Sequence, residues 1–233
     1  PMWQVVGQDR AIRFLESGIN RGGPAHAYLL VGPPHVGKTT LAINFAQALN
    51  CTAPQPPCGQ CPACTRIAAG KYSDIQVVSR LKDEKTGRFK RDISIDQMRD
   101  IQKTAQFPPY EGKFKVFIID GAELLSTEAA NCFLKTLEEP PSQVVFLLLT
   151  AKESNVLPTV ISRCQRLEVR PLPSGQVEDA LINRWGTEKS QAQLLAHLSQ
   201  GCLGWALQAK IEPQLLQQRQ EKIDRFRRLA KPG

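Results

Sequence analysis

The chain has 233 residues, of which 42% are hydrophobic, and its 30 Lys and Arg residues outweigh 22 Asp and Glu residues to give a net charge of +8. This size and apolar content fill one sizeable core and a small second domain, which excludes a disordered chain and a disulfide-stapled miniprotein. A basic chain of this size favours a phosphate-bearing partner, either nucleic acid or nucleotide. The sequence contains no run of about eighteen apolar residues and no signal-peptide pattern, so we expect no membrane partner and a cytoplasmic protein.

Five short runs rich in Val, Ile and Leu predict the buried strands of a parallel sheet, because such runs are apolar on both faces. Helix-length stretches lie between them, and the third begins at Ser94, a residue suited to cap a helix N-terminus. In chain order we expect helix 8–20, strand 27–32, helix 38–50, strand 74–79, helix 94–106, strand 115–120, helix 126–138, strand 144–150 and strand 165–171. This alternation predicts an α/β domain over residues 1–170, with helices on both faces of the sheet.

The pattern changes after Pro171 and Pro173, where the apolar runs stop and amphipathic stretches begin. These stretches predict a small all-helical domain over residues 171–211. Its three helices are expected at residues 175–185, 188–199 and 203–210. A further stretch, 213–230, begins with a proline suited to the first turn of a helix and predicts the start of another helical domain at residues 212–233.

Residues 32–39, Gly-Pro-Pro-His-Val-Gly-Lys-Thr, match G-x-x-x-x-G-K-[ST] and lie between a predicted strand and a predicted helix, as this phosphate-binding loop requires. The glycines let backbone N–H groups turn towards phosphate, Lys38 is placed to reach the β- and γ-phosphates, and Thr39 is placed to ligate Mg²⁺. A glycine-rich turn that binds nothing is the alternative. We expect the Lys38 side chain to be solvated while the site is empty.

Four of the seven cysteines form the pattern C-x6-C-x2-C-x2-C. In a chain without secretory features, clustered cysteines indicate metal ligands before disulfides. Four thiolates form a closed tetrahedral zinc site with no position for water, so the predicted role is structural. Redox chemistry and chance are the alternatives. The predicted ligands are Cys51, Cys58, Cys61 and Cys64, in a zinc module at about residues 51–64.

The strand predicted at residues 115–120 ends in Asp120, the position from which a P-loop ATPase holds Mg²⁺. An acid that polarises the attacking water should follow, but the next residue is Gly121 and the nearest acid is Glu123. The sequence therefore favours nucleotide binding over hydrolysis. A strand-end cap is the alternative role for Asp120.

Together with residues 129–141 (AANCFLKTLEEPP), Thr150 and residues 157–164 (LPTVISRC), these motifs resemble the AAA+ clamp-loader subunits of bacterial DNA polymerase III over about residues 4–210. The resemblance implies a RecA-like AAA+ core with a zinc-module insertion and a three-helix lid. It implies Zn²⁺ and ATP or ADP with Mg²⁺ as cofactors. Its implied partners are the motor (tau/gamma) and delta subunits of a hetero-pentamer, the sliding clamp and primed DNA. The implied nucleotide-binding residues are Gly32, Gly37, Lys38, Thr39, Thr40, Asp120 and Thr150.

Within this family, three departures favour the delta-prime subunit over the motor subunit. Gly121 stands where the motor has its catalytic glutamate, and Gly204 stands where the lid arginine of the motor reads the γ-phosphate. Residues 120–131 are also closer to delta-prime sequences. These departures imply weak or absent ATPase activity in the chain itself. An active motor subunit, and a nucleotide-binding module unrelated to replication, are the alternative hypotheses.

The segment Ser162-Arg163-Cys164 is intact, and the resemblance implies that Arg163 acts in trans as an arginine finger on the γ-phosphate of a neighbouring subunit. Without the resemblance, an arginine at a helix end paired with a carboxylate is the simpler interpretation.

Two basic segments, residues 80–91 and 210–233, each carry a net charge of +4. Charge runs of this kind are commonly solvated loops. In residues 80–91, Phe89 is the only aromatic side chain, so base-specific recognition is disfavoured. The segment predicts at most a sequence-independent contact with the DNA backbone.

Overall fold

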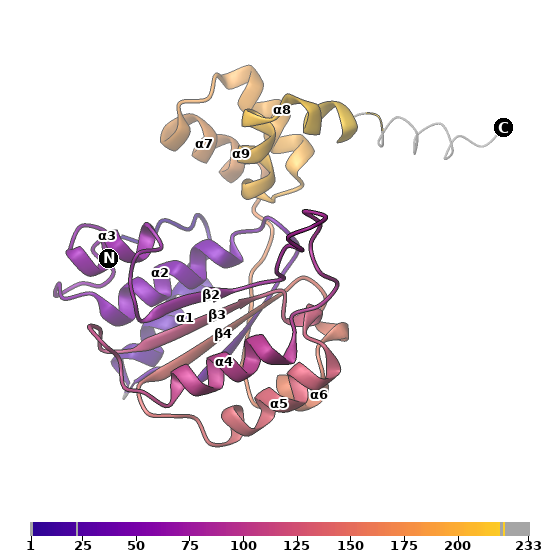
Figure 1. The fold of residues 1–233 in the computed structure, drawn as a ribbon. Coiled ribbons are helices and arrows are strands. Elements are labelled where there is room, and N and C mark those ends of the chain that lie inside the picture. The colour runs from indigo at the N-terminus through magenta and orange to yellow at the C-terminus, as the bar shows by residue number, and fades with distance from the viewer. Residues whose placement is uncertain (1, 22, 220, 222–233) are drawn as a thin grey trace. The chain divides into compact units, whose positions relative to one another are not determined.

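The computed structural model describes residues 2–21, 23–219 and 221 (Figure 1). The chain forms two compact units. The first, called the core unit, runs up to Gly32 and from Lys38 to Val169, and the second, called the lid unit, contains Pro33–Gly37 and the described residues from Arg170 onwards. Five residues inside the predicted core range therefore pack with the lid unit. None of the helices in the described ranges combines the length and hydrophobicity that crossing a membrane requires.

The core unit is built on one parallel sheet with the strand order β2-β3-β4-β1-β5. The five predicted strands and their parallel arrangement are confirmed. Because the strands are parallel, the segments that leave their carboxyl ends meet at one edge of the sheet. The strands are β1 (Ala27–Val31), β2 (Ile75–Val78), β3 (Lys115–Asp120), β4 (Val144–Thr150) and β5 (Gln165–Glu168).

The outer strands β2 and β5 differ from the sequence prediction. β3 and β4 in the middle of the sheet are buried along almost their whole length, as their apolar runs predict. In β2, by contrast, Val77 is 52% exposed, because an edge strand is covered less completely. β5 ends at Glu168, three residues before the predicted end at residue 171, and only Leu167 within it is buried.

Helices cover both faces of the sheet, as predicted, with α1, α2 and α3 on one side and α4, α5 and α6 on the other (Figure 1). On the second face Phe117 stacks on Phe146 with ring centroids 5.5 Å apart, and Phe133 of α5 meets Phe146 edge to face at 5.0 Å. On the first face Tyr28 meets Phe45 of α2 at 5.3 Å. The core-unit helices are α1 (Asp9–Asn20), α2 (Lys38–Asn50), α3 (Pro62–Ala68), α4 (Ile95–Ala105), α5 (Thr127–Glu138) and α6 (Pro158–Ile161), with the 3₁₀ turns η1 (Ala122–Leu124) and η2 (Glu153–Asn155).

Local sequence explains where several of these helices begin. Ser94 caps α4 as predicted, and together with Gln97 it forms a capping box, which satisfies two backbone N–H groups at once. The sequence analysis did not predict α3 and α6. Each has a proline in its first turn, Pro62 and Pro158, where the missing N–H carries no cost.

The lid unit contains the three predicted helices, α7 (Ser174–Trp185), α8 (Lys189–Ser199) and α9 (Leu203–Ile211). Their apolar faces pack together, and Val177, Leu181 and Leu195 are fully buried. The helix predicted at 213–230 is present over residues 213–219, whereas residues 222–230 lie outside the described residues.

The last residue of α2 ties that helix to the start of β3. The Asn50 side-chain carbonyl accepts hydrogen bonds from the N–H groups of Lys113 (2.8 Å) and Phe114 (3.0 Å). Its amide group donates to the carbonyl oxygens of Ala46 (3.2 Å) and Phe114 (3.1 Å). Asn50 is 3% exposed, so alanine at this position leaves these backbone groups without partners and with little access to water.

We expect Asn50→Ala to lower the free energy of unfolding by about 2 kcal/mol, because buried backbone groups lose their hydrogen bonds. Urea unfolding followed by circular dichroism measures this. Asn20→Ala, at the exposed end of α1, is the matched control and should change the unfolding free energy by less than about 0.5 kcal/mol. Equal effects of the two substitutions would contradict the structural role of Asn50.

Candidate functional site

The predicted phosphate-binding loop leaves the carboxyl end of β1 and enters α2 at Lys38. The Gly32 N–H donates to the Thr150 carbonyl (3.1 Å), which ties the start of the loop to β4. The Lys38 ammonium donates to the Gly32 carbonyl oxygen at 2.6 Å. Lys38 is only 9% exposed, so the expectation of a solvated lysine is wrong. Its loss therefore removes a part-buried hydrogen bond as well as the expected phosphate ligand.

The apex of the loop, Pro33–Gly37, has two residues with positive φ. Gly37 has φ +107°, a conformation that glycine adopts without strain and that turns the backbone before α2. His35 has φ +61°, which is uncommon for a residue with a side chain. The carbonyl of His35 accepts a hydrogen bond from the Gly204 N–H of α9 (2.9 Å), within the lid unit.

Gly204 has no room for a side chain in this arrangement. A Cβ atom there would lie 2.7 Å from the His35 carbonyl oxygen, which belongs to the backbone and cannot rotate away. Within the lid unit α9 therefore lies directly against the backbone of the loop apex, and position 204 has no space for a side chain.

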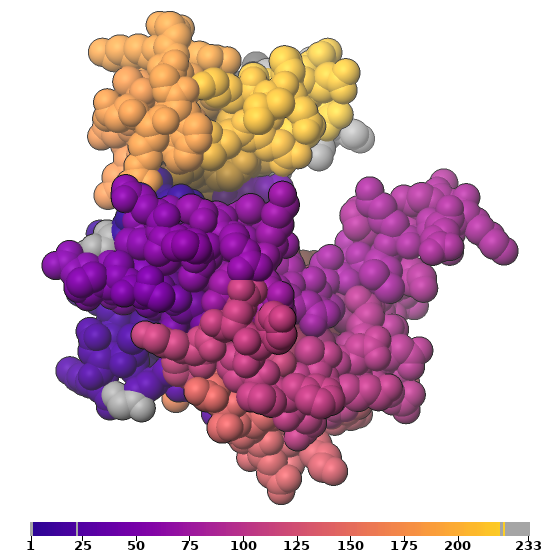
Figure 2. All heavy atoms as spheres, turned by 60° about the vertical axis from the view of Figure 1, so that its left-hand side comes forward, coloured from indigo at the N-terminus to yellow at the C-terminus, as the bar shows by residue number. Residues whose placement is uncertain are grey.

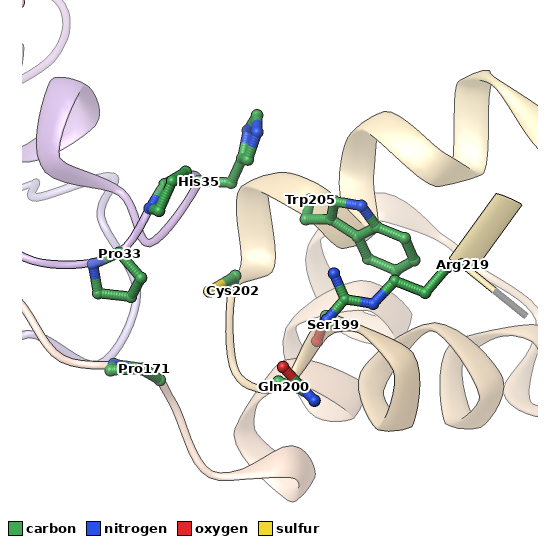
Figure 3. Close-up of a pocket in the computed structure, with 9 residues that line it drawn as sticks. Pro33, His35, Pro171, Ser199, Gln200, Cys202, Trp205 and Arg219 are labelled. Atoms are coloured by element: carbon green, nitrogen blue, oxygen red, sulfur yellow. The ribbon is translucent and has the colours of Figure 1, made fainter. Parts of the chain in front are cut away.

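A cavity of about 350 Å³ lies in the lid unit beside the loop apex (Figure 3). Pro33 and His35 from the loop form part of its wall, and Trp205 of α9 forms another part. Arg219 also lines the cavity, with its guanidinium carbon 4.8 Å from the centre of the Trp205 ring. The cavity thus offers an aromatic face and a positive charge next to the loop that is expected to hold phosphate. The sequence analysis missed it because Arg219 lies fourteen residues after Trp205 in a segment with no motif.

Asp120 and Thr150 end the neighbouring strands β3 and β4, as predicted. Burial raises the pKa of Asp120, the positive charge of Lys38 lowers it, and the negative charge of Glu123 raises it. The structure therefore brings Asp120 and Lys38 into electrostatic contact at the edge of the sheet. Thr150 is buried, and its hydroxyl oxygen accepts a hydrogen bond from the Lys152 N–H at 3.1 Å.

Gly121 and Glu123 occupy the turn η1 that follows Asp120. Gly121 has φ +97°, and a Cβ atom there would approach Leu124 Cδ1 to 2.8 Å, so a side chain at this position is strained. One carboxylate oxygen of Glu123 accepts a hydrogen bond from the Ala151 N–H at 3.0 Å. The other is buried and has no hydrogen-bond partner among the described residues. Glu123 is thus held against the end of β4, a position that its sequence spacing did not predict.

The four clustered cysteines come together, with their sulfur atoms all within 4.8 Å of one another. The Cys51 and Cys61 sulfurs are 3.9 Å apart, and those of Cys58 and Cys64 are 4.0 Å apart. A tetrahedral zinc ion with bonds of about 2.3 Å separates its sulfur ligands by roughly 3.8 Å, so the cluster has the dimensions of such a site. No other group of three or more potential ligands with this geometry occurs in the described part of the chain.

Backbone N–H groups point at these sulfurs and favour thiolates. The Cys58 sulfur accepts from the N–H groups of Gln60 (3.5 Å) and Cys61 (3.2 Å), and the Cys61 sulfur accepts from the Cys64 N–H (3.5 Å). Burial raises the pKa of Cys61, but hydrogen bonds from backbone N–H groups more than offset it and lower the pKa to about 6. Burial raises the pKa of Cys64 to about 12. A zinc ion would offset the negative charge of four adjacent thiolates, including that of buried Cys64, so the donor set fits zinc.

Arg163 lies on the surface just after α6. Its guanidinium donates to the carbonyl oxygen of Thr159 (2.7 Å) and to a carboxylate oxygen of Glu138 at the end of α5 (2.5 Å). The Arg163 and Glu138 side chains are 32% and 52% exposed. In the isolated chain the geometry is therefore the helix-end ion pair that the sequence analysis named as the alternative. α5 and α6 cover the face of the sheet opposite α2, so Arg163 is not part of the site around Lys38 (Figure 1).

Comparison with known proteins gives the family. The sequence profile described as "DNA polymerase III, delta subunit" matches residues 7–173. The chain belongs to this family. It is also 36% identical to DNA polymerase III subunit tau of Escherichia coli (strain K12) over 87% of the chain and 31% of that protein. The identity to subunit tau of Bacillus subtilis (strain 168) is 38%, over 73% of the chain and 29% of that protein.

The chain thus spans about a third of the length of these curated relatives. Among solved structures, the Thermotoga maritima RuvB branch-migration motor has a TM-score of 0.57 at 19% identity and covers 87% of the chain and 60% of that protein. A gamma subunit-related protein of DNA polymerase III from Thermotoga maritima has a TM-score of 0.53 at 20% identity, over 85% of the chain and 70% of that protein. These similarities confirm the predicted fold class. The resemblance to polymerase III clamp-loader subunits is confirmed for the family as a whole, since the profile carries the name delta and the relatives carry the name tau.

We expect the purified protein to contain one Zn²⁺ per chain, held by the four clustered sulfurs. Cys58→Ser should lower the zinc content well below one, because a hydroxyl is a much poorer zinc ligand than a thiolate. Cys132→Ser, outside the cluster, is the matched control and should keep the full content. Metal analysis by mass spectrometry measures both, and wild-type protein without zinc would show that the cysteines serve another purpose.

Proposed function

We propose that this chain is a delta-prime-type subunit of the bacterial DNA polymerase III clamp loader. In this proposal it binds nucleotide without efficient hydrolysis and donates Arg163 to a neighbouring motor subunit. Its partners are the tau/gamma and delta subunits of a hetero-pentamer, which loads the sliding clamp on primed DNA. Membership of the polymerase III family supports a role in the clamp loader. The backbone geometry of Gly121 is the observation that favours a delta-prime-type subunit over a motor subunit.

Gly121 matters because hydrolysis needs an acid that polarises the attacking water. The backbone at Gly121 is left-handed and close to Leu124, so the turn itself disfavours a glutamate at this position. The nearest acid, Glu123, has one oxygen engaged by the Ala151 N–H. A stabilising arginine or oxyanion contact cannot act on a water that is not activated, so nucleotide binding without rapid turnover is the expected behaviour.

The parts that bind nucleotide are retained. Lys38 and Asp120 lie at the same edge of the sheet, and Thr39 follows Lys38 in the first turn of α2. In the proposed complex, the loop amides and Lys38 hold the phosphates, while Thr39 and Asp120 hold Mg²⁺. Bound Mg²⁺ would also supply the positive charge that buried Asp120 needs to remain ionised.

The ion pair of Arg163 with Glu138 is compatible with action in trans. Exposed ion pairs contribute at most about 1 kcal/mol, so a partner with more charge displaces the carboxylate easily. A γ-phosphate carries more negative charge than a carboxylate and matches the forked donors of a guanidinium. In the proposed assembly, Glu138 holds Arg163 at the surface until the neighbouring site presents its phosphate.

An active motor subunit is the second candidate function. Two observations favour it: the similarity to tau subunits, and the buried oxygen of Glu123 that has no hydrogen-bond partner among the described residues. That oxygen lies on the residue whose charge raises the pKa of Asp120. Rapid hydrolysis by the chain alone would require Glu123 to activate water from this position.

We expect the wild-type chain to bind ATP and to hydrolyse it slowly, with no stimulation by DNA. Lys38→Ala should abolish binding, because the β- and γ-phosphates lose their main cationic ligand. Nucleotide affinity is measured by equilibrium binding of a fluorescent ATP analogue, and hydrolysis by steady-state phosphate release. Thermal unfolding checks that each variant is folded. Lys152→Ala, which removes an exposed lysine close to Thr150, is the control and should bind as wild type does. DNA-stimulated turnover by the wild-type chain would favour the motor hypothesis.

We expect Arg163→Ala to leave nucleotide affinity and loader assembly unchanged but to lower ATP hydrolysis by the reconstituted loader. The rate of ATP hydrolysis at the affected site should fall by a factor of about 10³ or more. The total hydrolysis rate of the loader falls only in part, because the other motor sites keep their own arginines. Arg163→Lys should restore little, because an ammonium lacks the planar fork.

Two matched variants separate this role from a structural ion pair. Arg166→Ala breaks a comparable exposed pair with Glu153 and should leave the loader rate unchanged. Glu138→Gln removes the other half of the Arg163 pair and should keep the rate at or above that of wild type. If Glu138→Gln and Arg163→Ala had the same effect on hydrolysis, Arg163 would be only a structural partner of Glu138.

A further inference from the structure

The basic segment between β2 and α4 folds as a hairpin. Lys82 and Phe89 form an antiparallel bridge, and the Lys90 N–H donates to the Leu81 carbonyl at 2.8 Å. Residues 80–91, called the basic hairpin below, project from the core unit as the magenta lobe in Figure 2. The hairpin follows the carboxyl end of β2, so it rises from the same edge of the sheet as the phosphate-binding loop.

Asp83 fixes the shape of the hairpin turn. One of its carboxylate oxygens accepts hydrogen bonds from the Lys85 N–H (3.1 Å), the Thr86 N–H (2.8 Å) and the Thr86 hydroxyl (3.0 Å). Gly87, with φ +67°, then closes the turn. The hydrogen bonds from Thr86 hold the pKa of Asp83 below its ordinary value. One of the two acidic side chains of the hairpin therefore has a structural function, and the hairpin has a defined shape of its own.

Carboxylates neutralise only part of the positive charge of the hairpin, which keeps a net charge of +4. Of its six basic side chains, Arg91 lies 3.9 Å from Asp92. The ion pairs in the described part of the chain include none of the other five. These five are Arg80, Lys82, Lys85, Arg88 and Lys90. All of them except Arg80, which is half-buried, are exposed, so the hairpin presents a concentrated cationic surface to solvent.

An exposed aromatic ring lies within this charge. Phe89 is 57% exposed, although a phenyl ring of this kind is normally buried. The Lys82 ammonium lies 5.2 Å from the ring centre and the Arg80 guanidinium carbon lies 5.6 Å from it. Cation–π attraction favours both cations near the ring, so two positive charges lie beside an aromatic surface.

We propose that the basic hairpin binds single-stranded DNA, with one unpaired base stacked on Phe89 and the flanking phosphates contacted by Arg80, Lys82 and Lys90. Single-stranded DNA binds to an aromatic ring among cations, because every base has a π-face that can stack on the ring and every phosphodiester carries a negative charge. In a duplex the base faces are covered by their neighbours, so the ring has no partner there. The choice of DNA over RNA rests on the proposed function, whereas the mode of binding rests on the hairpin alone.

The test uses the full chain and a fluorescein-labelled oligo-dT of twenty nucleotides, with anisotropy measured at several salt concentrations. Phe89→Ala should weaken binding about five- to tenfold and leave the salt dependence unchanged, because stacking does not involve counterions. Replacing Arg80, Lys82 and Lys90 together by Ala should weaken binding further. It should also make the slope of log K against log salt shallower by about two, since each phosphate contact on a single strand contributes roughly 0.7.

The matched control replaces Arg10, Arg13 and Lys71, three exposed basic residues outside the hairpin, by Ala. It should leave binding within about twofold of wild type. Equal losses in the two triple variants would show that net charge alone governs binding. Unchanged affinity in Phe89→Ala, or equally tight binding of polyglutamate, would overturn the stacking proposal. The assay contains no ATP and no other subunit, so its failure is distinct from a failure of the arginine finger.

Discussion

The burial of α2 is the constraint on which both ends of the candidate site depend. Ten of its thirteen residues are buried, so the helix has almost no freedom to rotate or slide. Three polar residues on it, Asn44, Gln47 and Asn50, are buried too, and each holds a different segment. Asn44 accepts from two backbone N–H groups near the N-terminus, Gln47 donates to the Cys64 carbonyl, and Asn50 binds the start of β3. The same rigid helix therefore positions the phosphate-binding loop at one end and the cysteine cluster at the other.

Most of the fold could be predicted because its signals are local. The apolar runs of β3 and β4 are buried on both faces, and Ser94 starts α4 through a capping box within one turn of sequence. The missed elements depend on tertiary structure. α3 is only seven residues long and follows a proline-rich stretch, and the Gln47 bond to its Cys64 carbonyl helps to hold it in place. β5 pairs with β1 over Gln165–Glu168, and the sequence carries no local signal for where that pairing stops.

The candidate site shows the same difference between local sequence patterns, which were predicted, and tertiary contacts, which were not. The P-loop and the four cysteines are short-range patterns, and the structure brings each set together. Three contacts join residues that are distant in sequence, and no spacing rule predicts them: Arg163 with Glu138, Glu123 with the Ala151 N–H, and Gly204 with the His35 carbonyl. The cation–π contacts of the hairpin are an intermediate case. Charge and an aromatic residue were visible in sequence, but the antiparallel pairing that brings Phe89 close to Lys82 and Arg80 was not.

Gly121 and Gly204, the two glycines on which the proposed choice of subunit rests, are constrained in different ways. At Gly121 the backbone is left-handed, so any side chain strains the chain itself, and the nearest atom belongs to Leu124. At Gly204 the backbone is ordinary helix, but the space for a side chain is taken by the His35 carbonyl. A glutamate at position 121 would strain the left-handed backbone of the turn, and an arginine at position 204 would require α9 to move off the loop apex. The proposed loss of hydrolysis therefore follows from the backbone at these two positions as well as from the two missing side chains. The hydrogen-bond partners of Arg163 are Thr159, Ser162 and Glu138, so its proposed role in trans does not depend on either glycine.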